Sequence, residues 1–207
     1  MSTRRGKNDN GTTTRDGILA LAARLFARNG YKATNLQAVA DELDVTRQAL
    51  YYHFRSKGDI LAALFDDVMT RMEEAVDAVP DEGDADRFVS MLRAHIAVIV
   101  DNIDLVAVLM HERAEIAKLN GLNAARRRQE YSKQFIAAYE DGVRAGRLRD
   151  MDPWAVTNML LASANSTATW YRGRDRRRFP VAVASDHVFD LLVGGVLTQS
   201  ATPATAA

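Results

Sequence analysis

Residues 34–57 read TNLQAVADELDVTRQALYYHFRSK, and this stretch decides the fold of the N-terminal part of the chain. Thr34, with a glutamine three residues later, has the pattern of a capping box, so a short helix is predicted to start here. Asp44 lies where the following turn needs a left-handed residue, a conformation that aspartate tolerates better than most residues. Thr46 is then predicted to cap a second short helix. Two short helices joined by such a turn form a helix-turn-helix, here over about residues 35–54, whose second helix enters the major groove of DNA.

The second of these helices has a layout suited to contacting DNA. Leu50 and Phe54 are four residues apart, so both are expected to pack inward on the first helix. Arg47 and Gln48 lie in the first turn and are expected to face base edges, where arginine suits guanine and glutamine suits adenine. Phosphate contacts are expected from side chains at the rim of the helix and at helix N-termini, namely Tyr52, His53, Lys57, Thr34 and Thr46.

The same residues resemble the TetR/AcrR family of transcriptional regulators. The stretch ATNLQAVADELDVTRQALYYHFRSKGDILAALF follows that family's signature almost position for position, and the preceding helix has the similar ending LFARNGYKAT. The resemblance covers about residues 14–65. It implies base contacts by Arg47, Gln48 and Tyr51, and phosphate contacts by Thr34, Thr46, Tyr52, His53 and Lys57.

Two residues depart from the family's pattern. Many relatives have glycine in place of Asp44, so slight strain is expected in the turn. Many also have glycine or another small residue in place of Gln48, and the longer side chain is expected to alter the base preference. The operator sequence is therefore not transferable from relatives.

Charge is distributed unevenly along the 207 residues although the formal net charge is zero. Residues 1–60 carry ten Lys and Arg against six Asp and Glu, a net of +4, whereas the remainder carries 17 against 21, a net of −4. This asymmetry predicts that an anionic polymer binds only the basic N-terminal part of the chain. The chain has no cysteine, no apolar run long enough to span a membrane and no signal peptide, so a cytoplasmic location is expected.

The periodicity of apolar residues predicts an all-α fold of about nine helices, four of them in the first 80 residues. Asn29-Gly30 ends the first helix, and a capping box at 56–59 starts a longer one that runs to about Val79. Asp152-Pro153 is predicted to be the N-cap and first-turn proline of a later helix. The remaining helices are expected over about 85–101, 104–118, 122–146, 153–172 and 182–198.

Two domains are expected. A three-helix DNA-binding head occupies residues 12–72, and a helical body for ligand binding and dimerisation occupies 73–200. Residues 1–11 and 201–207 are predicted to be disordered, the latter from its low-complexity sequence ATPATAA.

The family's general plan implies that the last two long helices pair with those of a second subunit in a four-helix bundle, forming a homodimer. The last helix fits this plan, because Gly194-Gly195 allows close approach of helices and apolar residues accompany it. The expected dimer contacts are Val188, Phe189, Leu192 and Val196. The alternative is that this helix covers the core of its own subunit.

A pocket for a small-molecule effector is implied by the same plan, and its candidates are polar or aromatic residues within apolar stretches. They are Phe88, His95, Met110, Arg113, Tyr131, Phe135, Tyr139, Asn158, Asn165, Thr169 and Trp170. The ATWYR ending of the penultimate helix resembles the branch of the family that responds to acyl-CoA thioesters. The Arg172–Arg178 cluster then has two interpretations, a binding loop for CoA phosphates or a solvated charged loop.

Competing functions have less support in the sequence. No cysteine nucleophile, GxSxG motif, phosphate-binding glycine loop or dinucleotide fingerprint is present, so the chain is not expected to be an enzyme or to hold a cofactor. The four histidines lack the spacing of a metal site, so no metal is expected. A ligand-independent architectural DNA-binding protein remains the alternative to an effector-released repressor.

Overall fold

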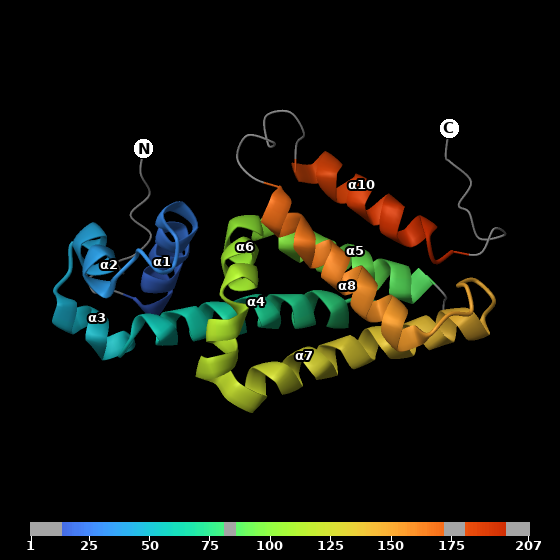
Figure 1. Ribbon diagram of the computed structural model, residues 1–207, viewed down its shortest axis with the longest axis horizontal. Helices are drawn as coiled ribbons and strands as arrows, with labels where there is room; N and C mark the ends of the chain where they lie inside the picture. The colour runs from blue at the N-terminus through green and yellow to red at the C-terminus, as the bar shows by residue number, and fades with distance from the viewer. Residues whose placement is uncertain (1–13, 81–85, 172–180, 198–207) are drawn as a thin grey trace. The chain divides into compact units, whose positions relative to one another are not determined.

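The computed structural model describes residues 14–80, 86–171 and 181–197, which form nine α-helices and no β-strand (Figure 1). The prediction of an all-α fold is confirmed. The chain forms two compact units, one of Met1–Val68 with Asp104–Ala124 and the other of Met69–Ile103 with Ala125–Ala207. The expected domain boundary at residue 73 lies near the first division, and residues 104–124 pack with the N-terminal unit.

The N-terminal unit is built on three short helices, α1 (Arg15–Asn29), α2 (Leu36–Leu43) and α3 (Arg47–His53), with the first part of α4 (Lys57–Asp77). The Thr14 side chain caps α1 by accepting a hydrogen bond from the Gly17 N–H, and α1 ends at Gly30, whose φ of 85° suits glycine. The inward face of these helices forms one core of Ile18, Leu21, Leu25, Phe26, Leu50, Phe54, Ile60 and Leu61.

The predicted cap of the second helix is wrong by one residue. Asn35, not Thr34, is the N-cap of α2, and its side chain accepts a hydrogen bond from the Ala38 N–H. The predicted capping box at the start of α4 is confirmed. The Ser56 hydroxyl accepts from the Asp59 N–H while the Asp59 carboxylate accepts from the Ser56 N–H.

Residues 104–124 complete the N-terminal unit with α6 (Ile103–His111) and the first part of α7 (Arg113–Arg144). The sequence predicts one helix to residue 118 and another from 122, and the helical backbone is indeed interrupted between them, at Gly121. That glycine has φ 49° and ψ −130°, outside the helical region, so the helix changes direction there. A further break, which the sequence did not predict, lies at Glu112 between α6 and α7.

The C-terminal unit comprises the later part of α4, α5 (Asp86–Asp101), the later part of α7, α8 (Pro153–Trp170) and α10 (Val181–Gly194). Helices α5, α8 and α10 pack on one another (Figure 1). Asp152 caps α8 through the Ala155 N–H and proline follows, as predicted. The expected terminal disorder and the Arg172–Arg178 cluster lie outside the described residues. No helix in the described part is long and apolar enough to cross a membrane.

Candidate nucleic-acid interface

The turn between α2 and α3 is fixed by backbone and side-chain hydrogen bonds. Asp44 adopts the predicted left-handed conformation, with φ 55° and ψ 49°, and its N–H bonds back to α2. The Val45 N–H donates to the Ala40 carbonyl at 3.1 Å, and the Thr46 hydroxyl caps α3 by accepting from the Ala49 N–H at 3.2 Å. Val45 is half-buried. These bonds hold α3 in one orientation relative to α2.

Helix α3 has one buried face and one exposed face. Leu50 and Phe54 are buried at 0% and 4% exposure, as the sequence predicts. Arg47, Gln48 and Tyr52 are exposed, and Tyr52 is 87% exposed. An exposed aromatic ring on a short helix has little to contact within the chain, so this face is available to a partner.

Arg47 and Tyr51 form a pair on the exposed face. An Arg47 guanidinium N–H donates to the Tyr51 hydroxyl at 2.8 Å, and the guanidinium carbon lies 5.2 Å from the centre of the tyrosine ring. The two side chains restrict each other, which lowers the conformational entropy that either would lose on contacting a base.

A shallow groove of about 520 Å³ lies between the start of α2 and the exposed face of α3. Its walls carry cationic and hydrogen-bonding groups and include the cap of α2. It is lined by Lys32, Ala33, Thr34, Asn35, Leu36, Gln37, Arg47, Tyr51 and Lys57. The arrangement suits a phosphate backbone running past a helix N-terminus. Asn35, which sequence analysis missed, is the exposed polar residue at that N-terminus.

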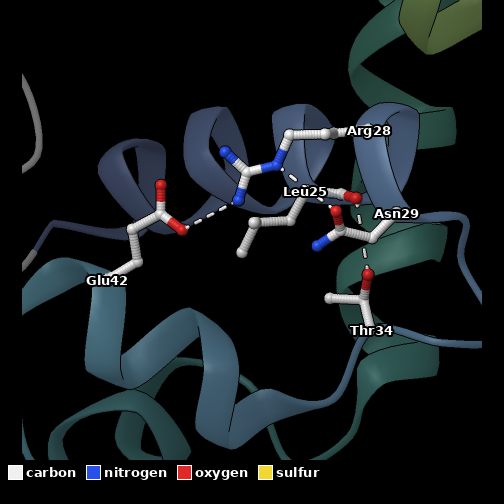
Figure 2. A network of polar contacts seen from close by, with 5 residues as sticks. All are labelled: Leu25, Arg28, Asn29, Thr34 and Glu42. Carbon is white, nitrogen blue, oxygen red and sulfur yellow. Dashed lines mark hydrogen bonds and ion pairs between the residues drawn. The ribbon is translucent and has the colours of Figure 1, made fainter.

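Thr34, predicted to contact a phosphate, is instead buried at 2% exposure. Its hydroxyl donates to the carbonyl of Gly30 at 2.9 Å. It also lies 3.4 Å from the carbonyl of Leu25 (Figure 2). The same view shows the ion pair of Arg28 with Glu42, at 3.3 Å, which joins α1 to α2. The Thr34 side chain therefore fixes the end of α1 and does not face the groove with a free hydroxyl.

Lys57 is also predicted to contact a phosphate, but its ammonium group points at backbone carbonyls. Nζ donates to the carbonyl oxygens of Tyr31 at 2.7 Å, Lys32 at 3.3 Å and Thr34 at 2.8 Å. It also lies 4.3 Å from the centre of the Tyr31 ring. Burial lowers the pKa of Lys57, and Glu112 and Glu115 act against that shift. Lys57 is thus a positioning residue that fastens residues 31–34 to the start of α4.

The other predicted phosphate contacts remain at the surface. Thr46 is exposed at the start of α3, and Tyr52 and His53 lie at its end with ring centres 5.2 Å apart. The structure therefore keeps three of the five predicted phosphate contacts at the exposed end of the head, and it directs the side chains of Thr34 and Lys57 inward.

Five of the predicted pocket residues gather in the C-terminal unit, where rings from α5 and α7 meet edge to face or tilted. Ring centres lie 5.1–6.1 Å apart, a range typical of aromatic packing. The five residues are Phe88, His95, Tyr131, Phe135 and Tyr139. They are buried at 6% exposure or less.

The other predicted pocket residues are not brought to this cluster by any contact the structure shows. Met110 and Arg113 belong to the N-terminal unit. On α8, the side chains of Asn158 and Thr169 donate to carbonyls of their own helix, Asn165 is half-buried, and Trp170 is 55% exposed. Sequence analysis missed Thr157, whose buried hydroxyl has no hydrogen-bond partner among the described residues.

Two of the four predicted dimer contacts lie in the core of the protomer. Phe189 and Val196 are 5% and 4% exposed, and the Arg93 guanidinium covers the Phe189 ring at 3.8 Å. Val188 and Leu192 are half-buried. Among the described large apolar side chains of α10, the one that is exposed is Leu191, at 80%, which sequence analysis did not select.

Replacing Lys57 by Met should lower the free energy of unfolding by about 1–3 kcal/mol, because the variant loses charge-assisted bonds to backbone carbonyls while keeping most of the aliphatic stem. Chemical denaturation measures this. Lys118→Met, which removes an exposed lysine of the same unit, is the matched control and should change stability by less than about 0.5 kcal/mol. Equal effects of the two variants would contradict the positioning role.

Comparison with known proteins agrees with this geometry. Residues 18–64 match the model described as bacterial regulatory proteins, tetR family, and residues 81–196 match that of the tetracyclin repressor-like C-terminal domain.

The HTH-type transcriptional repressor KstR2 of Mycolicibacterium smegmatis is 25% identical over 164 residues, covering 76% of this chain and 79% of that protein. The TetR family regulator PfmR of Thermus thermophilus superposes with a TM-score of 0.76 at 24% identity, covering 86% and 97% of the two chains. AibR, solved in complex with isovaleryl coenzyme A and operator DNA, superposes with a TM-score of 0.69 at 22% identity, covering 86% and 96%. The chain therefore belongs to the TetR family, and it is a DNA-binding transcriptional repressor and not an enzyme.

Proposed function

We propose that this repressor acts as a homodimer on a palindromic operator and leaves it when a small hydrophobic or acyl-CoA-type molecule binds its body. Arg47, Gln48 and Tyr51 contact base edges, and Thr46, Tyr52 and His53 contact phosphates together with Asn35 at the start of α2. Two recognition helices related by the dimer axis would be about 34 Å apart, one turn of DNA.

The observation that carries the DNA-binding part is the two-sided α3. Its inward residues are fully packed, so the helix cannot rotate to hide Arg47 and Gln48. Guanine O6 and N7 accept two bonds from an arginine, and adenine N6 and N7 pair with a glutamine. Each such pair discriminates against a wrong base by about 1–3 kcal/mol.

Arg47→Ala and Gln48→Ala should each weaken binding to an operator selected from random DNA by roughly 10- to 100-fold. Binding to unrelated DNA should change far less, because that binding depends on phosphates. Fluorescence anisotropy with both DNAs at one fixed salt concentration gives the ratio of the affinity for the selected operator to the affinity for unrelated DNA.

Lys118→Ala is the charge-matched control, since it removes one exposed cation of the same unit that lies on α7 and not on α2 or α3. It should leave the ratio of selected to unrelated affinity unchanged. If Arg47→Ala and Gln48→Ala also leave that ratio unchanged, α3 is not the recognition helix.

Effector release is supported by the buried aromatic cluster in the C-terminal unit and by the likeness to AibR, a protein solved with both isovaleryl coenzyme A and operator DNA. The alternative is an architectural DNA-binding protein that ignores metabolites. The two differ in one property, a coupling free energy between DNA and a small molecule.

Titration of isovaleryl-CoA and longer acyl-CoA thioesters into the DNA complex should raise the Kd for DNA at least about fivefold, the lower end of common allosteric coupling. Coenzyme A alone and the matched free acids are the controls. An unchanged Kd with every thioester and with hydrophobic drug-like molecules would favour the architectural alternative.

The dimer face we assign lies on α8 and α10, which pack on each other. Leu191 and Met159 are 80% and 69% exposed, and Val188 and Leu192 are half-buried beside Leu191 in sequence. Large apolar residues exposed on two packed helices are typical of a surface that another chain covers.

Leu191→Glu should weaken the dimer by at least about tenfold, because each protomer loses the burial of a leucine and gains a charge at the contact. Sedimentation equilibrium measures the dissociation constant. Met151→Glu, an equally drastic change at a residue 47% exposed outside α8 and α10, is the control. A dimer as strong as the native one in Leu191→Glu would exclude this face.

A further inference from the structure

One buried polar atom in the C-terminal unit, the Nε2 atom of His95, has no hydrogen-bond partner among the described residues. His95 is 1% exposed, and its other ring nitrogen, Nδ1, lies 2.9 Å from the Tyr131 hydroxyl. Tyr131 and Phe135 pack against the imidazole, with ring centres at 5.7 and 6.1 Å. A buried imidazole nitrogen has lost its hydrogen bond to water, and here no described residue replaces that bond. The desolvation of Nε2 is therefore a cost to the stability of the unit.

The tautomer of His95 follows from counting donors and acceptors. If Tyr131 donates to Nδ1, the imidazole proton sits on Nε2, and a single N–H is left without an acceptor. If Nδ1 donates to Tyr131, both the phenol proton and the Nε2 lone pair lack partners. The first arrangement leaves fewer unsatisfied groups, so Nε2 is a hydrogen-bond donor.

We infer that the Nε2–H of His95 anchors the effector through an uncharged acceptor oxygen, such as the carbonyl of a ketone, ester, amide or thioester, with the aromatic cluster against the ligand's apolar body. The inference rests on the proposed effector response and deepens it, because it gives the chemistry of the buried end of the ligand.

The surroundings of this anchor favour a neutral acceptor over a carboxylate. Burial lowers the pKa of His95 to about 4, so the imidazole is neutral near pH 7 and offers no positive charge. The pKa of Tyr131 is raised, first by burial and then by the negative charges of Glu73 and Asp77. These two carboxylates act on Tyr131, and Glu73 is itself paired with Arg127. A buried anion would lose its hydration here without a cationic imidazole to offset that loss, whereas a neutral dipole has less hydration to lose.

The anchor is also connected to α4. Arg127, four residues before Tyr131 on α7, donates to the two carboxylate oxygens of Glu73 at 2.7 and 2.6 Å and to the Thr70 hydroxyl at 2.7 Å. Residues four apart on a helix lie on one face, so Tyr131 is on the same face of α7 as Arg127, which binds α4. A ligand that shifts Tyr131 would therefore act on this contact through the backbone of α7.

The test uses the full-length protein without DNA, so that its failure is distinct from a failure of operator recognition. The probes are 2-octanone, methyl octanoate and octanoate, added to the native protein and to the double variant His95→Leu with Tyr131→Phe. Binding is followed by the ¹⁵N signals of the histidine ring nitrogens and by the shift in Tm. The ketone or the ester should shift the His95 Nε2 signal and should bind the native protein about three- to tenfold more tightly than the double variant, the effect of one neutral hydrogen bond.

The ligand-free double variant should keep its Tm within about 2 °C of the native value or exceed it, because both polar partners are removed together. Tyr139→Phe is the stability control from the same cluster. The Tyr139 hydroxyl is satisfied by the Arg149 carbonyl at 2.7 Å, so its removal should lower the Tm. Binding of octanoate as strong as that of the ketone would overturn the inference. So would equal affinity for native and double variant, the absence of binding by both neutral probes, or a Tm loss in the double variant as large as in Tyr139→Phe.

Discussion

The exposed face of the DNA-binding head depends on one cation, the ammonium group of Lys57. Its three donors match three backbone carbonyls in residues 31–34, a segment that has no helix of its own to satisfy them. Charged hydrogen bonds of this kind are about twice as strong as neutral ones. Because Asn35 follows this segment directly, the same contact helps to hold the start of α2 in place relative to α4.

The rest of the head is held by local bonds that each satisfy a helix terminus. Asn35, Thr46 and the pair of Ser56 and Asp59 cap three successive helices, and Asp44 turns the chain between two of them. Caps of this kind contribute about 1 kcal/mol each, so none of them determines the fold alone. Together they leave few alternative orientations for a helix of only seven residues, α3. A recognition surface needs this restriction, because hydrogen bonds to base edges fail with small errors of placement.

Local patterns could be predicted from sequence where they depend on neighbouring residues, and not where they depend on distant ones. The helix-turn-helix, the left-handed Asp44 and the Asp152 cap are properties of a few consecutive residues, and the structure has all three. Thr34 and Asn35 can both cap a helix, and only the burial of Thr34 against the end of α1 selects Asn35. In the same way, nothing within the last helix reveals that Phe189 turns inward, because the partner that covers it, Arg93, is on α5. Residue type alone selects the pocket candidates, so those that lie apart in the fold could not be separated from those that meet.

The two units treat inward-facing polar groups in opposite ways, and the contrast bears on their roles. In the head, the ammonium of Lys57 has every donor matched by a carbonyl, which favours a single conformation. In the body, the pair of His95 and Tyr131 is buried with one donor unmatched, which lowers the stability of the unliganded state. A ligand that supplies the missing acceptor removes this desolvation cost. It therefore stabilises the ligand-bound state by that amount, in addition to the free energy of its apolar contacts. Tyr131 shares its helix face with Arg127, which holds Glu73, so the effector binding that we propose would be coupled to the contact between α7 and α4. An unsatisfied donor at this position is therefore unfavourable for stability alone and favourable for a sensor.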